Sequence, residues 1–530
     1  MSNTARETIY ALSSGRPPAA IAVVRISGPR AGDALKTLMG RIPEQRKAAL
    51  ARVRGLDGEI IDQALVLWFP GPHSETGEDV AELQLHGGRA VVAAVMAALS
   101  KVDGLRPAEA GEFTRRAFEN GKLDLTAVEG LADLVMAETE GQRRQAFRQM
   151  TGALGDRSEK WRAQLIQALA LVEARIDFSD EADVPQDLVT PALQIAGSLE
   201  SDIASVLAEG DSGERLREGL VVAIAGPPNA GKSTLLNRIA KRDVAIVSPY
   251  AGTTRDVIEV HLDLHGLPVT LLDTAGIRET EDPIEREGVR RARARAAGAD
   301  LILWVVDAGD AARPGEAGHA SHSKDDVGNN VGSQRVSLGI AAGSPGGASH
   351  VTRFAPRESR SSSNESRRAP MWLVRNKIDL YQRLMRRNEQ RLPSKGKGEP
   401  SLRVNKPLTS VINRALREKS EVEFTFNESE FDVSAATGEG FEVLLAALAR
   451  HAERFLTGAE PALVTRERHR HALQETVAAL RRALAPDMSG REDLLAEELR
   501  LAARALGRLT GRVDVDDVLD VIFRDFCIGK

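Results

Sequence analysis

Residues 220–233, LVVAIAGPPNAGKS, decide the fold of the middle of this 530-residue chain. A short apolar strand leads directly into the pattern GxxxxGK[ST], and a helix is expected to follow over Thr234–Ala240. In that context glycines let backbone N–H groups face phosphates, Lys232 neutralises the β/γ charge, and Ser233 binds Mg²⁺. A glycine-containing turn that merely caps a helix explains motif, strand and helix together less well. The stretch therefore predicts a nucleotide-binding P-loop.

Apolar strands alternate with helices on the C-terminal side of this motif, between residues 218 and 455. The strands read LVVAIAG, LPVTLLD, DLILWVVD, MWLVRNK and EFDVSA, which predicts a doubly wound parallel sheet. Two segments interrupt the pattern. Residues 311–370 are rich in Gly, Ser, Ala, Arg and Asn without an apolar period, and residues 383–428 are strongly charged. We interpret both as insertions, the first of them disordered.

Two further motifs are typical of the switch regions of G proteins. The strand LPVTLLD ends in Asp273, whose carboxylate can meet the Mg²⁺ shell through water, while the N–H of Gly276 can sense the γ-phosphate. Thr254 lies between the P-loop helix and that strand, as a switch I threonine should, and is assigned to Mg²⁺. Ile277 stands where Ras-like proteins carry the glutamine that orients the attacking water. Candidate replacements, each also consistent with a solvated face, are Glu279, Glu281, Asp282, Glu285 and Glu287.

The base-binding motifs select guanine. Asp379, in Asn376–Asp379 after the strand MWLVR, can accept from the N1–H and 2-amino group of guanine, a donor pair that adenine lacks. Ser434–Ala436 supplies the loop that closes over the guanine O6. The chain is therefore predicted to be a GTPase. Its predicted nucleotide-binding residues are Asn229, Ala230, Gly231, Lys232, Ser233, Thr234, Ser248, Thr253, Thr254, Asp273, Thr274, Ala275, Gly276, Asn376, Lys377, Asp379, Ser434, Ala435 and Ala436.

The flanks of the G domain predict two further domains. Residues 1–122 mix short β-like runs with helical ones and are interpreted as an α+β domain. Residues 123–217 and 456–530 are both helical, and the second carries one apolar stripe, Leu495, Leu499, Ala502, Leu506 and Leu509. We infer that the G domain is inserted between the two halves of one discontinuous helical domain.

Composition indicates an intracellular protein. With 42% hydrophobic and 28% charged residues, no apolar run long enough for a membrane span and no secretory signal, the chain is expected to be cytoplasmic. One cysteine, Cys527, cannot form an internal disulfide. The net charge of −5 argues against a generic polyanion binder but leaves RNA docking on a local basic face open. His469 and His471 have no evident third ligand, so they are interpreted as solvated basic residues rather than a metal site.

Segments outside the G motifs resemble the MnmE (TrmE) family of tRNA-modification GTPases. They are VVRISGP, LWFPGPHSETGEDVAELQLHGG, RPAEAGEFTRRAFENGKLDLTAVEGLADL and the terminus FCIGK. The resemblance covers nearly all of the chain outside the two insertions. It implies a folate-binding N-terminal domain, a discontinuous helical domain and an inserted G domain. It also implies a homodimer that works with the FAD-containing flavoprotein MnmG and, from a 5-formyl- or 5,10-methylene-tetrahydrofolate donor, installs a carboxymethylaminomethyl or aminomethyl group on wobble uridine of tRNA.

The same resemblance assigns roles to individual residues. A potassium ion would be bound by Asn229, Ser248, Tyr250 and Thr253 and would replace an arginine finger, and Glu285 would orient water. Together with Lys232 and Thr254, Glu285 forms the predicted catalytic set. Folate contacts would fall on Arg25, Glu82, Lys122 and Lys530. Cys527 would lie near the folate or uridine chemistry, as a nucleophile or as a structural element.

Two other functions are consistent with parts of the sequence. A ribosome-assembly G protein would use GTP to dock rRNA, but such proteins usually append an RNA-binding domain, and no KH-like GXXG unit is evident in the C-terminal half. A GTPase whose N-terminal domain has lost folate binding is the third reading. Analysis of tRNA wobble nucleosides would separate these from the modification enzyme.

Overall fold

A computed structural model describes most of the chain, in segments. The described residues are 7–178, 187–208, 211–227, 229–242, 244–246, 259–273, 298–311, 369–389, 426–456, 462–488, 490–513, 522 and 529. Contacts divide the chain into two compact units. The first contains Met1–Leu220, Leu262–Val269 and Leu448–Lys530, and the second contains Val221–His261 and Thr270–Ala447. No helix within the described segments is long and apolar enough to cross a membrane.

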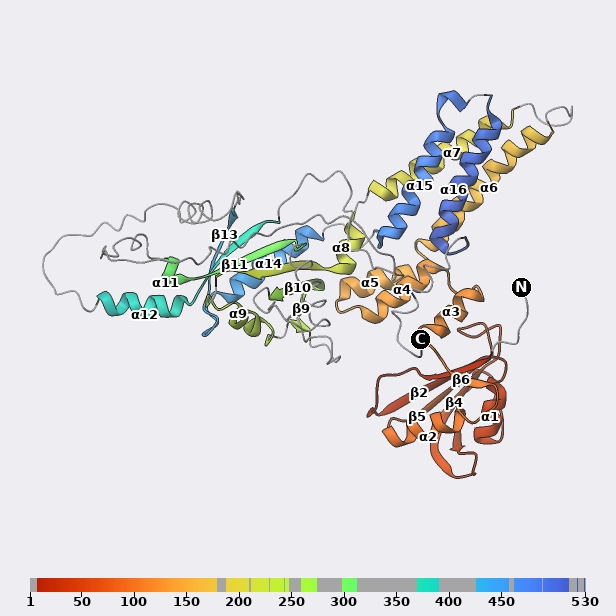
Figure 1. Cartoon of the computed structure of the whole chain (residues 1–530), viewed down its shortest axis with the longest axis horizontal. Helices are drawn as coiled ribbons and strands as arrows, with labels where there is room; N and C mark the ends of the chain where they lie inside the picture. The colour runs from red at the N-terminus through yellow and green to blue at the C-terminus, as the bar shows by residue number, and fades with distance from the viewer. Residues whose placement is uncertain are drawn as a thin grey trace, which may run out of the picture. The chain divides into compact units, whose positions relative to one another are not determined.

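The first unit begins with a six-stranded sheet covered by helices on one face (Figure 1). Alternating burial along the strands turns one set of side chains, among them Val24, Val66 and Leu83, toward helices α1 and α2, where they form a common core. The strand order is β3-β4-β5-β2-β1-β6. The elements are β1 (Thr8–Leu12), β2 (Ile21–Ser27), α1 (Ala31–Met39), β3 (Ala49–Arg54), β4 (Ile60–Phe69), β5 (Val80–His86), α2 (Arg89–Leu99) and β6 (Leu105–Pro107).

Short helices follow the sheet, and their starts are encoded locally. The Asp124 side chain accepts a hydrogen bond from the N–H of Ala127 at 2.9 Å and caps the N-terminus of α4. Thr139 and Gln142 form a capping box at the start of α5. These helices are α3 (Glu112–Glu119), α4 (Leu125–Met136) and α5 (Glu140–Met150), and α8 (Ser212–Glu218) comes directly before the second unit.

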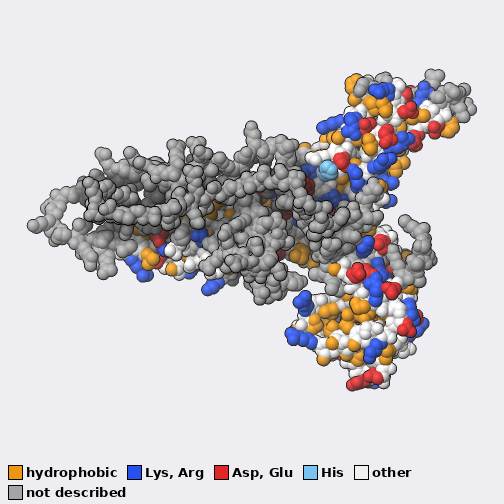
Figure 2. Space-filling view, viewed as in Figure 1, with side chains coloured by type: hydrophobic (Ala, Val, Ile, Leu, Met, Phe, Trp, Pro, Cys, Tyr) orange, Lys and Arg blue, Asp and Glu red, His pale blue; other side chains and the backbone are white. Residues whose placement is uncertain are grey.

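Four long helices from both sides of the G domain share one apolar core. Trp161 and Leu165 of α6, Leu199 of α7, Leu480 of α15 and Leu499 of α16 all belong to it. The predicted discontinuous helical domain is therefore confirmed. On the side shown in Figure 2, basic and acidic side chains are interspersed over this bundle. The helices are α6 (Gly155–Asp177), α7 (Val189–Ala208), α15 (Glu467–Ala483) and α16 (Glu492–Thr510), with a 3-10 turn η2 (Pro486–Met488).

The predicted G domain, residues 218–455, contains a seven-stranded sheet with the order β13-β12-β11-β7-β10-β9-β8. Strands β7, β11, β12 and β13 pair in parallel, as the alternation of strands and helices predicts. The strands are β7 (Leu220–Ala225), β8 (Ala245–Ile246), β9 (Glu259–Leu264), β10 (Leu267–Asp273), β11 (Leu301–Asp307), β12 (Met371–Asn376) and β13 (Phe426–Asp432). The helices are α9 (Lys232–Ile239), α11 (Ala308–Ala311), α12 (Ile378–Glu389) and α14 (Phe441–Phe455).

The structure corrects the boundaries of the second predicted insertion. Helix α12 continues to Glu389 and strand β13 begins at Phe426, so regular elements occupy both ends of residues 383–428. The full length of α12 was not predicted because its sequence, IDLYQRLMRRNE, is charged and contains few apolar residues. Residues 312–368, within the first predicted insertion, lie outside the described residues.

Candidate functional site

The P-loop connects β7 to α9 and depends on two glycines. Gly226 has φ +140° and Gly231 has φ +90°. A Cβ atom at Gly226 would lie 2.1 Å from the carbonyl oxygen of Val305, and one at Gly231 would lie 2.3 Å from Nδ2 of Asn376. Asn229 adopts φ +62°, which Asn tolerates better than most residues. Only glycine fits at the two tight positions, so the loop backbone is held in the shape of a phosphate cradle.

The charged and hydroxyl groups predicted to contact the phosphates and Mg²⁺ form hydrogen bonds within the chain. The Lys232 ammonium donates to the carbonyl oxygens of Gly226 at 2.9 Å and Pro227 at 2.8 Å. The Ser233 hydroxyl donates to Oδ2 of the buried Asp273 at 2.8 Å. A hydroxyl beside a carboxylate offers the hard oxygen ligands that Mg²⁺ prefers, and substrate phosphates complete such sites. The described residues contain no cluster of three or more His, Cys, Asp or Glu side chains that could hold a metal ion.

Asn376 connects the P-loop to the predicted base-binding loop. Its buried side chain donates through Nδ2 to the carbonyl oxygen of Ala230 at 2.9 Å, and its Oδ1 accepts from the N–H of Ala435 at 2.9 Å. The Ser434 hydroxyl donates to Oδ1 of Asp379 at 2.6 Å. One carboxylate oxygen of Asp379 is thereby fixed by the loop. The structure thus brings together the motif residues from positions 230, 376, 379 and 434–435, although they come from three separate stretches of sequence.

Asp307, at the end of β11, belongs to this arrangement and was missed in the sequence. Its Oδ2 lies 2.8 Å from Nζ of Lys377, and its Oδ1 accepts from the N–H of Gly309 at 2.9 Å. Burial raises the pKa of Asp307, but the hydrogen bonds from Lys377 and Gly309 outweigh it and hold that pKa below its usual range. Its position at the carboxyl end of a parallel strand was the available signal, because ligands bind at that edge of such sheets.

Several predicted site residues lie outside the described residues. They are the switch I positions Ser248, Tyr250, Thr253 and Thr254, the switch II positions Thr274, Ala275, Gly276 and Glu285, and the C-terminal Cys527 and Lys530.

A second polar site lies on the N-terminal sheet, where two predicted folate contacts meet. Arg25 of β2 donates through Nε to Oε1 of Glu82 on β5 at 3.0 Å, and its Nη1 lies 2.8 Å from Oε2 of Glu75. The Arg25 guanidinium also lies over the Phe113 ring, 5.8 Å from its centroid. Register alone places Arg25 opposite Glu82. The guanidinium is therefore oriented by two carboxylates and an aromatic ring.

Lys122, the third predicted contact, lies against the loop that carries Glu75. Gly77 of that loop has φ +80°, and a Cβ atom there would lie 3.4 Å from Cε of Lys122 and 2.9 Å from Cβ of Asn120. The Asn120 side chain donates to the carbonyl oxygen of Thr76 at 2.7 Å. Loop 70–79 therefore adjoins both Arg25 and Lys122.

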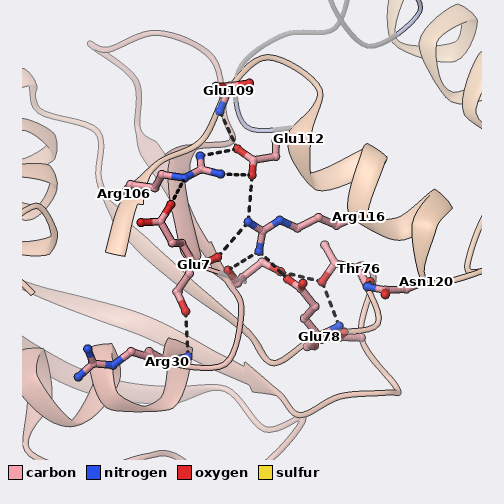
Figure 3. Close-up of polar contacts among 12 residues, drawn as sticks. Glu7, Arg30, Thr76, Glu78, Arg106, Glu109, Glu112, Arg116 and Asn120 are labelled. Carbon is pink, nitrogen blue, oxygen red and sulfur yellow. Dashed lines mark hydrogen bonds and ion pairs between the residues drawn. The ribbon is translucent and has the colours of Figure 1, made fainter. Parts of the chain in front are cut away.

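A buried ionic network fixes this loop to helix α3 (Figure 3). Arg116 of α3 donates to Oε2 of Glu78 and to Oε1 of Glu112, both at 2.9 Å, and its side chain is only 5% exposed. The Ser27 hydroxyl donates to the same Glu78 oxygen at 2.9 Å and shares a 2.7 Å hydrogen bond with Thr76. This network could not be predicted from the sequence, because arginines and glutamates in a helix usually form solvated faces.

Glu112 is the most strongly perturbed carboxyl of the network. Burial raises its pKa, but hydrogen bonds from Arg106, from the Glu109 N–H and from Arg116 outweigh burial and lower the pKa to about 2. Arg106 contributes two bonds, at 2.7 and 2.8 Å. Glu112 is therefore ionised at neutral pH and holds Arg106 and Arg116 side by side (Figure 3).

Gly529 lies close to the N-terminal sheet. A Cβ atom on this residue would lie 2.2 Å from the carbonyl oxygen of Leu12, at the end of β1. Gly529 has φ +100°, so glycine suits this position for two reasons. On the paired strand β2, Arg25 lies opposite Ala11, next to Leu12. Gly529 thus contacts the residue that follows Ala11, the strand partner of Arg25.

The interpretation of His469 as a solvated residue is wrong. His469 is completely buried, and its Nε2 lies 2.6 Å from Oε2 of Glu129 on α4. Burial lowers the pKa of His469. Arg468 also donates to that carboxylate, at 2.8 Å. The network joins the two halves of the helical domain, whereas His471 is exposed.

Two family models match nearly the whole chain. The model described as the MnmE helical domain matches residues 125–527, and the model described as the GTP-binding protein TrmE N-terminus matches residues 8–122. The tRNA modification GTPase MnmE of Rhodopseudomonas palustris (strain BisB5) is 51% identical over 524 residues, covering 99% of each chain. The protein of the same description from Rhodospirillum rubrum is 47% identical over 537 residues, again covering 99% of each chain. A crystal structure of Era from Aquifex aeolicus is 24% identical, covers 43% of this chain and 56% of Era, and has a TM-score of 0.21.

Proposed function

The chain belongs to the MnmE family of tRNA modification GTPases, and from this premise we propose the reaction that its two polar sites serve. The enzyme is a GTP hydrolase that acts in tRNA modification. We propose that it works with an FAD-dependent partner, the flavoprotein MnmG. The product is a carboxymethylaminomethyl or aminomethyl group at C5 of tRNA wobble uridine, with the one-carbon unit supplied by a tetrahydrofolate.

One observation supports this proposal: the chain has one polar site at the P-loop and a second one on the N-terminal sheet. In the first, Asn376 connects Ala230 to Ala435 and Ser434 fixes Asp379. In the second, Arg25 and Glu82 form a paired cation and carboxylate, 15% and 18% exposed, on the sheet face opposite the helix-covered core. A carboxylate suits the pterin amino edge, and a cation suits the glutamate tail.

The hydrolytic device combines residues of the P-loop with the switch regions. Ser233 and Thr254 would bind Mg²⁺, and Lys232 would neutralise charge on the transferred phosphoryl group. Asn229, which is exposed and has φ +62°, would bind K⁺ with Ser248, Tyr250 and Thr253. The ion would supply the positive charge that an arginine finger provides in other GTPases, and Glu285 would orient the attacking water.

The folate site would use Arg25, Glu82 and Lys122, with Lys530 and Cys527 brought near by the C-terminal segment. The support for the last two is the close backbone approach of Gly529 to Leu12. Either 5-formyl- or 5,10-methylene-tetrahydrofolate would fit this chemistry. Cys527 would act there as a nucleophile or as a structural element.

A homodimer would cover the open face of the N-terminal sheet. Ile21, Leu50 and Leu65 are 58%, 59% and 42% exposed. The strand register places them on the same face as Arg25 and Glu82, opposite the helix-covered core. Hydrophobic side chains are also visible on this N-terminal part in Figure 2. Large apolar residues grouped on one exposed face are typical of an interface, so the folate site would adjoin the dimer contact.

Isotope transfer tests the proposed reaction directly. The full-length chain, the flavoprotein partner, GTP in KCl and unmodified tRNA would be incubated with tetrahydrofolate labelled in its one-carbon unit. Label at C5 of the wobble uridine is expected, and Arg25→Ala should reduce it. Label absent from tRNA in the complete wild-type mixture would contradict the proposal.

The potassium device has its own test. Hydrolysis should be much faster in KCl than in NaCl at equal ionic strength, because Na⁺ is too small for a cage of oxygens spaced for K⁺. Glu285→Ala should abolish the K⁺-stimulated rate while GTP affinity stays nearly unchanged, as expected for an interaction made in the transition state. Equal rates in the two salts would eliminate potassium, and a fully active Glu285→Ala enzyme would eliminate the glutamate.

A further inference from the structure

Arg238, on the helix that follows the P-loop, binds three successive carbonyl groups of the predicted base-binding loop. Its Nη1 donates to the carbonyl oxygens of Ala435 at 3.3 Å and Ala436 at 2.8 Å, and its Nη2 donates to that of Thr437 at 2.7 Å. Hydrogen bonds from a charged donor are stronger than those between neutral groups. One side chain of α9 thus holds a loop that is about 200 residues away in sequence.

The loop is shaped around this guanidinium. Gly438 has φ +92°, and a Cβ atom there would lie 2.2 Å from Nη2 of Arg238. The guanidinium also lies over the Phe441 ring, 5.9 Å from its centroid. Gly438 leaves room for the guanidinium on one side, and the Phe441 ring packs against it on another.

The three bonds fix the direction of the peptide groups. In a trans peptide the N–H points away from the C=O, so the N–H groups that share these peptides, those of Ala436, Thr437 and Gly438, face away from Arg238. The N–H of Ala435 donates to Asn376, and that of Thr437 donates at 3.1 Å to the Ser434 hydroxyl that in turn binds Asp379. Within the described segments, the N–H of Ala436 has no hydrogen-bond partner. The donors of the loop are therefore on the side of the base-recognition residues.

We propose that Arg238 is a positioning residue for guanine recognition. By holding three carbonyl oxygens away from the base, it keeps the loop N–H groups, that of Ala436 first, directed at the guanine O6. Without it, a peptide flip would place a carbonyl oxygen against O6, where two acceptors repel. The inference rests on the proposed function, since it takes Asp379 and Ser434–Ala436 as the guanine contacts.

Three nucleotides separate O6 recognition from the rest of the site. GDP offers O6 and the 2-amino group, 6-thio-GDP replaces O6 with a weaker acceptor, and IDP keeps O6 but lacks the 2-amino group that Asp379 recognises. Their affinities would be measured on the full-length chain by competition with a fluorescent guanine nucleotide. Arg238→Ala should reduce the preference for GDP over 6-thio-GDP by up to about tenfold, the value of one hydrogen bond. The preference for GDP over IDP should remain.

Two further variants make the result decisive. Arg238→Lys keeps the charge and the aliphatic stem but cannot span three carbonyls, so its preference for GDP over 6-thio-GDP should be intermediate. If the alanine variant does not fold, the affinities of this lysine variant provide the test. Arg242→Ala is the matched control, because Arg242 lies four residues further along the chain, just past the end of α9, and pairs with Glu442 instead of the loop. This control should keep both ratios.

Losses that are equal for all three nucleotides in the Arg238 variants would overturn the proposal and assign the residue a purely structural role. Unchanged ratios in a folded Arg238→Ala protein would overturn it as well. Failure of the underlying guanine assignment looks different: the wild-type chain itself would then not distinguish GDP from IDP.

Discussion

The nucleotide site and the N-terminal polar site are built from the same kinds of side chain in different ways. Around the P-loop, functional groups come from loops at the carboxyl ends of parallel strands. Such loops carry contiguous sequence motifs, such as Asn376–Asp379, from which the functional residues can be predicted. On the N-terminal sheet, Arg25 and Glu82 come from the face of antiparallel strands and meet only through register. Sites formed by loops can therefore be predicted from a single sequence, whereas sites formed on the face of a sheet can be recognised only when the strand pairing is known.

The largest expected effect is at the base-binding loop. Asp379→Asn inverts the donor and acceptor pattern opposite N1 and the 2-position, so GTP should lose affinity by up to about 10⁴-fold while XTP gains. Competition binding measures the exchange. Asp432→Asn is the control, because that exposed carboxylate at the end of the neighbouring strand pairs with Arg375 instead. If GTP still outcompetes XTP in the Asp379 variant, the base assignment is wrong.

The next effect concerns the network behind the N-terminal site. Arg116→Ala removes the buried cation that Glu78 and Glu112 share and should destabilise the N-terminal sheet by about 3–5 kcal/mol. Amide hydrogen exchange of β1 and β2 in the full chain measures this locally. Arg115→Ala changes the adjacent, 43% exposed arginine and should cost less than about 1 kcal/mol. Equal exchange in the two variants would show that the network adds no stability.

A smaller effect is expected on the sheet face itself. Arg25→Ala should weaken binding of a reduced folate by about tenfold, the loss of one charge-assisted contact. Isothermal titration of the full chain with 5-formyl-tetrahydrofolate would measure it. Arg52 lies on the same face of the sheet, and Arg52→Ala should leave affinity unchanged. Folate affinity that survives Arg25→Ala would move the site elsewhere.

The smallest effect is predicted for the first insertion. Deletion of residues 315–365 should leave GTP affinity unchanged, because the segment has no periodicity of a buried element. Nucleotide titration of the shortened chain tests this. Loss of soluble expression or of affinity would mean that the segment packs against the G domain.

Sequence reasoning reached the elements and residues that local rules specify. The strand before the P-loop, the four parallel strands and the helices on both sides of the G domain follow from apolar period and turn residues. Side-chain pairs between residues far apart in the sequence could not be predicted in this way. Asp307 with Lys377, Arg238 with the loop at residues 435–437, and His469 with Glu129 each depend on tertiary packing. In each of these pairs the polar side chain reads as an ordinary surface residue when the sequence is all that is known.

We infer that one chain couples GTP hydrolysis to uridine modification. Nucleoside mass spectrometry of tRNA tests this coupling most directly. Cells lacking the gene would be complemented with the wild-type chain or with Glu285→Ala. Wobble uridine is expected to carry its carboxymethylaminomethyl or aminomethyl group only with the wild-type chain. Wobble nucleosides that are unaltered in cells lacking the gene, or fully modified with the Glu285→Ala variant, would contradict it.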